Sequence, residues 1–68
     1  MEKDWILVFS TGQPYQAELA RQVLEENNIQ AVVINKKDSS YLAFGETEVY
    51  VRLDDIIRAK NLVKTLEP

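Results

Sequence analysis

Cysteine and histidine are both absent from this 68-residue sequence. Without cysteine the chain forms no disulfide and has no thiolate nucleophile, and without histidine it has no imidazole base. The two side chains that most often bind zinc are therefore missing as well. A domain of this size buries only about 60% of the surface of its unfolded chain. We therefore expect its stability to depend on a well-packed core or on a partner subunit.

Glycine and long apolar runs are also scarce. The two glycines, Gly12 and Gly45, form neither a Walker motif nor a GxGxxG motif, and we expect no cofactor. The longest wholly apolar run, Trp5 to Phe9, has five residues, whereas about twenty are needed to span a bilayer. Because Glu2 and Asp4 stand where a secretion signal would carry basic residues, we expect a cytoplasmic protein with no membrane partner.

Basic residues are outnumbered in this chain. Eight lysines and arginines stand against eleven acidic residues, which gives a net charge of −3 and a pI of about 4.8. The largest basic cluster is the pair Lys36-Lys37. Because nucleic-acid-binding domains are usually basic, nucleic acid is not the partner that the composition favours.

Hydrophobic periodicity predicts three strands and two helices. Residues 5–10 form an apolar strand whose lack of polar positions indicates burial on both faces, and residues 30–35 form a second strand. Residues 47–52 alternate cleanly, which is typical of a half-buried strand. A helix is expected from Pro14 to about Asn27, and a second is expected to be capped by Asp54. The expected apolar stripes are Leu19, Ala20, Val23 and Leu24 in the first helix, and Ile56, Ala59, Leu62, Val63 and Leu66 in the second.

The resulting order, βαββα, predicts a single α+β domain over residues 1–68. It is a ferredoxin-like sandwich that lacks the last strand of the usual βαββαβ pattern. The sheet should be three-stranded and antiparallel, in the order second, third, first, with both helices on one face. Asn28 is suited to the left-handed position that ends the first helix, followed by Ile29 as its hydrophobic contact.

The other face of this sheet then has no helix to cover it. If Ile6 and Val8 face the helices, the opposite face should carry a set of apolar and aromatic side chains, namely Trp5, Leu7, Phe9 and Tyr50. An apolar patch of that kind rarely stays exposed in a monomer. We therefore expect a homodimer formed through this face or through the free edge of the first strand. The alternative is a platform that stacks bases of single-stranded nucleic acid.

A long connection joins the second and third strands, where two to five residues would suffice. Its polar first part predicts a binding segment that presents two cations and several hydroxyls, made up of Lys36, Lys37, Asp38, Ser39, Ser40 and Tyr41. The apolar residues that follow are expected to pack on the domain. Glu46 and Glu48 lie on one face of the third strand, so carboxylate chemistry is a further alternative, although a solvated charged surface is the simpler interpretation.

Four segments make the chain resemble a bacterial family. They are Trp5-Ile-Leu-Val-Phe-Ser-Thr11, Ala17-Glu-Leu-Ala20, Val23-Leu-Glu-Glu-Asn-Asn-Ile29 and Ala31-Val-Val-Ile-Asn-Lys-Lys-Asp-Ser-Ser-Tyr41. The sequence is similar to the putative prokaryotic signal-transducing proteins over almost its whole length. It departs from them at Asn28, where the family commonly has glycine.

The resemblance implies a ferredoxin-like fold similar to that of the nitrogen-regulatory PII proteins. In those proteins a loop between the second and third strands contacts partners, and ATP binds between subunits. The phosphate-binding residues of that ATP site have no match here. The hypothesis is therefore a non-enzymatic regulatory module that binds an unidentified protein or small molecule through the long connection.

Overall fold

The computed structural model describes residues 4–35 and 47–66. Within them the chain forms three strands, two α-helices and two short 3₁₀ turns. Their bounds are β1 (Trp5–Thr11), α1 (Pro14–Glu26), β2 (Ala31–Asn35), β3 (Thr47–Arg52), η2 (Leu53–Asp55), α2 (Ile56–Val63) and η3 (Lys64–Leu66). The predicted βαββα order and α+β class are confirmed.

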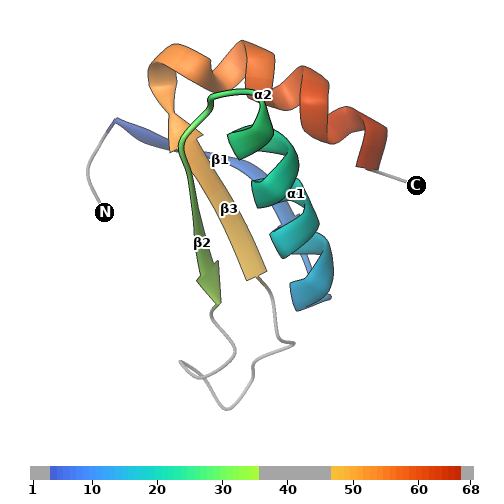
Figure 1. Ribbon diagram of the computed structural model, residues 1–68. Helices are drawn as coiled ribbons and strands as arrows, with labels where there is room; N and C mark the ends of the chain where they lie inside the picture. Colours follow the sequence, from blue (N-terminus) through green and yellow to red (C-terminus); the bar gives the residue numbers. More distant parts are fainter. Residues whose placement is uncertain (1–3, 36–46, 67–68) are drawn as a thin grey trace.

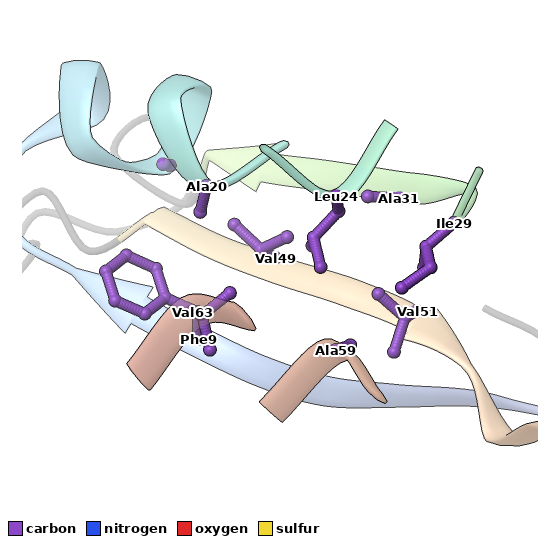
Figure 2. Packing of buried hydrophobic residues seen from close by; sticks show 10 residues of the cluster. Phe9, Ala20, Leu24, Ile29, Ala31, Val49, Val51, Ala59 and Val63 are labelled. Carbon is purple, nitrogen blue, oxygen red and sulfur yellow. The ribbon is translucent and has the colours of Figure 1, made fainter. Parts of the chain in front are cut away.

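The strands form a single antiparallel sheet in the order β1-β3-β2, as predicted. Figure 1 shows β3 between the other two strands. In Figure 2, α1 lies over β2 and β3, and α2 lies over β1. Both helices therefore cover the same face of the sheet. The core between the layers is made of Phe9, Ala17, Ala20, Leu24, Ile29, Ala31, Val49, Val51, Ala59 and Val63.

The central strand β3 follows the predicted alternation. Thr47, Val49 and Val51 are at most 1% exposed and point toward the helices. The residues between them lie on the other side of the sheet and are half-buried or exposed. Strand side chains alternate between the two faces of the sheet. A residue of β1 or β2 therefore lies on the same face as the β3 residue with which it pairs.

The strand β1 contains a β-bulge that the sequence pattern did not predict. Leu7 pairs with Tyr50, but Phe9 pairs with Val49, so Val8 is an extra residue opposite β3. A bulge of this kind places two successive side chains on one side of the sheet. Val8 and Phe9 both pack on the helix side, and Phe9 is 8% exposed. The prediction that Phe9 faces away from the helices is therefore wrong.

The two faces of β1 are also less alike than predicted. Leu7, on the face away from the helices, is 42% exposed, so burial of the strand on both faces is not observed among the described residues. An uninterrupted apolar run shows that a strand is apolar on both sides. It does not show that the same chain covers both sides.

The helix α1 begins at Pro14 as predicted, and its buried stripe agrees with the predicted one at Ala20 and Leu24 but not at Leu19. Ala17, Ala20 and Leu24 are fully buried, whereas Leu19 is 49% exposed. After the helix, Asn28 has φ 65°, in the left-handed region, and the backbone N–H of Ile29 donates to the carbonyl of Leu24 at 2.9 Å. The predicted helix end is confirmed.

Arg21 links two acidic side chains along the exposed side of α1. Its guanidinium lies 2.8 Å from Glu18 and 2.9 Å from Glu25. The hydrogen bond to Glu18, followed by the negative charges of Glu18 and Glu25, raises the pKa of Arg21 above its usual value. The Arg21–Glu25 pair was expected from their i,i+4 spacing, and the bond to Glu18 extends it to three residues.

The start of the second helix differs from the prediction. Leu53–Asp55 form the 3₁₀ turn η2, and Asp55 occupies the position before α2 without a side-chain cap. Asp54 is therefore inside the turn and does not cap the helix. The predicted apolar stripe of α2 does face the core, with Ala59 and Val63 buried and Ile56, Leu62 and Leu66 packed beside them.

Candidate functional site

The sheet face opposite the helices is the candidate site, and it is called the open face below. Three residues on β1, two on β2 and three on β3 point to it, and none of the eight is buried. Trp5, Leu7 and Tyr50 lie there, as predicted from the sequence. The full set is Trp5, Leu7, Ser10, Val32, Ile34, Glu48, Tyr50 and Arg52.

Side-chain contacts organise the aromatic residues of the open face. The guanidinium of Arg52 lies over the ring of Trp5, 5.3 Å from its centre. The hydroxyl of Tyr50 donates a hydrogen bond to Glu48 at 2.8 Å. Because each aromatic group already has a charged neighbour on its own sheet, a base would have to displace or share these contacts. The acidic Glu48 beside Tyr50 also repels a phosphate backbone.

A groove follows the outer side of β1. Among the described strands β1 pairs with β3 alone, so its other edge carries no strand. The groove has a volume of about 560 Å³ and runs from this edge to Gln16 of α1 and Leu66 of η3. It is the place where the fourth strand of a complete ferredoxin-like sheet would lie. No charged side chain occurs in β1, so the edge lacks a common protection against pairing with another strand.

The long connection joins the end of β2 to the start of β3, and these two strand ends are paired with each other. Asn35 of β2 pairs with Thr47 of β3, and Thr47 is 1% exposed. Its Oγ1 is buried without a hydrogen-bond partner among the described residues. The predicted binding residues Lys36, Lys37, Asp38, Ser39, Ser40 and Tyr41 lie outside the described residues, and so does Glu46.

The strand–helix turn at the same end of the sheet is held by side-chain contacts. The Thr11 hydroxyl lies 2.6 Å from the Gln16 side-chain oxygen and donates a hydrogen bond to it. The same hydroxyl oxygen accepts the backbone N–H of Gln13 at 3.1 Å. These bonds fix the start of α1 beside the ends of β1 and β3.

Two further observations concern the described residues 4–35 and 47–66. They contain no group of three or more acidic, histidine or cysteine side chains that could hold a metal ion. No helix among them has the length and apolar character needed to cross a membrane.

Sequence reasoning left five members of the open face out of the candidate interface. Glu48 and Arg52 were assigned to the same side of the third strand as Tyr50 but not to the interface, and Ser10 was assigned to no face. Val32 and Ile34 of β2 were predicted as strand residues without a facing. Their positions follow from pairing with β3, since Val32 lies opposite Tyr50 and Ile34 opposite Glu48. A period of two along each strand would have found them once the strand order was known. Phe9 was included wrongly, because a bulge breaks that period.

Comparison with known proteins gives a single informative result. The model of one protein family matches residues 5–67, and the family is described as "Putative prokaryotic signal transducing protein". Searches of curated proteins and of solved structures gave no significant match. The matched range includes β1, β2 and β3 and both α-helices of the part of the chain that the structure describes.

Proposed function

Because the chain belongs to the family of putative prokaryotic signal transducing proteins, we propose that it is a non-enzymatic regulatory module that works by binding. The proposed binding segment is residues 36–46. The observation that carries the proposal is the pairing of Asn35 with Thr47. Eleven residues therefore leave and re-enter the sheet at neighbouring strand ends.

A connection of this length is not needed to close the hairpin. Two to five residues commonly join adjacent antiparallel strands, and each additional ordered residue costs about 1–2 kcal/mol of backbone entropy. Long loops in small domains are commonly functional. The length of residues 36–46 is therefore more typical of a functional loop than of a purely connecting one.

The composition of the segment supports recognition of an acidic partner or ligand. Lys36 and Lys37 are adjacent cations in a chain whose net charge is −3. Three hydroxyl groups follow shortly after the lysines in the sequence, on Ser39, Ser40 and Tyr41. Lysine ammonium groups and hydroxyls together can bind carboxylates or phosphates.

The test compares two variants that remove the same charge from different places. The loop variant is Lys36→Ala/Lys37→Ala, and the control is Lys60→Ala/Lys64→Ala on the exposed side of α2 and η3. Each purified protein is used as bait in a lysate of the source organism, and small molecules retained by each are measured by native mass spectrometry. We expect binding that is kept by the wild type and the control and is lost from the loop variant.

Thermal melting of the same proteins separates binding from folding. Surface substitutions usually change the free energy of unfolding by less than about 0.5 kcal/mol, so both variants should melt close to the wild type. Equal capture by all three proteins would contradict a binding role for the lysine pair. A loop variant that is unfolded would show that the segment is needed for stability instead.

A further inference from the structure

The central strand carries an ordered row of charge on the open face. Glu48, Tyr50 and Arg52 occupy alternate positions of β3 and point to the same side. Successive members are about 7 Å apart along the strand, because each residue rises about 3.3 Å. The row thus has a negative end, an aromatic centre and a positive end. Turning the row end over end about Tyr50 exchanges the positions of the negative and positive side chains.

The centre of the row is flanked by apolar residues on both neighbouring strands. Leu7 of β1 and Val32 of β2 are both paired with Tyr50. A line across the sheet at this level therefore meets an aliphatic, an aromatic and an aliphatic side chain. The charged groups lie to either side of this line, Glu48 toward one end of the sheet and Arg52 toward the other.

We propose that a second copy of this chain packs face to face on the open face. The two-fold axis of this dimer lies between the two sheets, runs perpendicular to the strands and passes over Tyr50. In this arrangement Glu48 faces Arg52 of the partner subunit, and the symmetry repeats the contact with the roles exchanged. Leu7, Tyr50 and Val32 each meet their own equivalent. Such an isologous contact requires a surface that is complementary to itself, and the Glu48–Tyr50–Arg52 row has that property.

The charge pattern also selects this axis over the other face-to-face arrangement. A two-fold axis parallel to β3 would place Glu48 against Glu48 and Arg52 against Arg52. Like charges across an interface oppose association and disfavour the wrong orientation. The two sheets would pack with their strands antiparallel, rotated by about 30° because each sheet is twisted.

Contacts within one subunit hold the row in place for this interaction. The Tyr50 hydroxyl bonds to Glu48, and the Trp5 ring lies beneath the Arg52 guanidinium. Side chains that are already ordered lose less entropy on association.

The size of the face sets the expected strength of the dimer. Three strands about 4.8 Å apart, each contributing about 20 Å of length, offer less area than the roughly 800 Å² that each partner buries in a standard stable interface. An area this far below the standard places the contact among weak, transient interfaces, so we expect a dimer that forms only at high micromolar concentration or above. This inference concerns the open face and does not depend on the role of residues 36–46.

The test uses charge reversal and measures mass by sedimentation equilibrium over a range of concentrations. Glu48→Arg and Arg52→Glu, each alone, should raise the dimer dissociation constant about tenfold or more, because each change creates two repulsive contacts. An equimolar mixture of the two variants should restore dimerisation, since every opposed pair then has opposite charge. The double variant Glu48→Arg/Arg52→Glu should also dimerise.

Control variants carry the same charge changes on the helices. Glu26→Arg of α1 and Lys60→Glu of α2 are exposed and lie away from the open face, and both should dimerise like the wild type. Rescue in the mixture also excludes simple unfolding of the single variants. The proposal is overturned if the mixture stays monomeric, or if the wild type is monomeric at millimolar concentration.

Discussion

The β-bulge in β1 leads to a quantitative prediction about two neighbouring apolar side chains. Phe9 is 8% exposed and belongs to the core, whereas Leu7 is 42% exposed on the open face. Truncation of a buried phenylalanine to alanine usually costs about 3–5 kcal/mol, because contacts are lost and a cavity remains. We expect Phe9→Ala to cost at least about 3 kcal/mol and Leu7→Ala less than about 1.5 kcal/mol.

The first of these losses is large for so small a domain. At roughly 0.05–0.15 kcal/mol per residue, the whole chain has about 3–10 kcal/mol of stability. A loss of about 3 kcal/mol should lower the melting temperature by about 12–24 °C. Phe9→Leu removes less volume and gives a folded variant for comparison if Phe9→Ala does not fold.

Urea unfolding followed by circular dichroism measures both effects. The protein should be kept at low micromolar concentration, so that association does not contribute to the stability of Leu7. Leu19→Ala is the control for a half-exposed leucine, at 49% exposure on α1. If Leu7→Ala costs as much as Phe9→Ala, then β1 is a regular strand without the bulge, and the assignment of faces along it is wrong.

Two further predictions concern the helix end and a buried hydroxyl. Asn28 has φ 65°, so Asn28→Gly should leave the melting temperature unchanged or raise it slightly. Asn28→Ala should instead lower the free energy of unfolding by about 1 kcal/mol, as measured in urea. Equal stability of the two variants would contradict the left-handed conformation. Thr47→Val replaces a buried hydroxyl that has no hydrogen-bond partner among the described residues, so calorimetry should show a stability equal to or higher than that of the wild type. A decrease of more than about 1 kcal/mol in the free energy of unfolding would show that the hydroxyl does form a hydrogen bond.

The sequence was sufficient where local pattern and tertiary packing agree. In β3, every second residue is buried, and the predicted bounds match the observed Thr47–Arg52. At the end of α1, Asn28 and Ile29 adopt the predicted arrangement because the left-handed position strongly restricts the choice of residue. The strand order followed from the βαββα pattern and the rules of strand connection.

The errors occur where one local pattern permits two geometries. Nothing in Trp5–Thr11 distinguishes a regular strand from a bulged one, since it contains neither glycine nor proline. Phe9 was therefore assigned by strict alternation to the wrong face. Asp54 has the residue type of a helix cap, but the 3₁₀ turn η2 places it one position before the N-cap residue Asp55. In both cases the decisive factor is packing against another element, which a local pattern does not contain.

The extra residue in β1 has a consequence for changes in chain length. Pairing with β3 has one register before Val8 and another after it, and the two differ by a single residue. Deletion of Val8 would merge them into one continuous register and leave Ile6, Phe9 and Thr11 directed toward the helices. Deletion of Ser10 would instead have to shift the strand end relative to β3 or alter the turn into α1. The first strand thus contains a position at which the chain can be shortened by one residue while the other inward-facing side chains, apart from Val8 itself, remain inside.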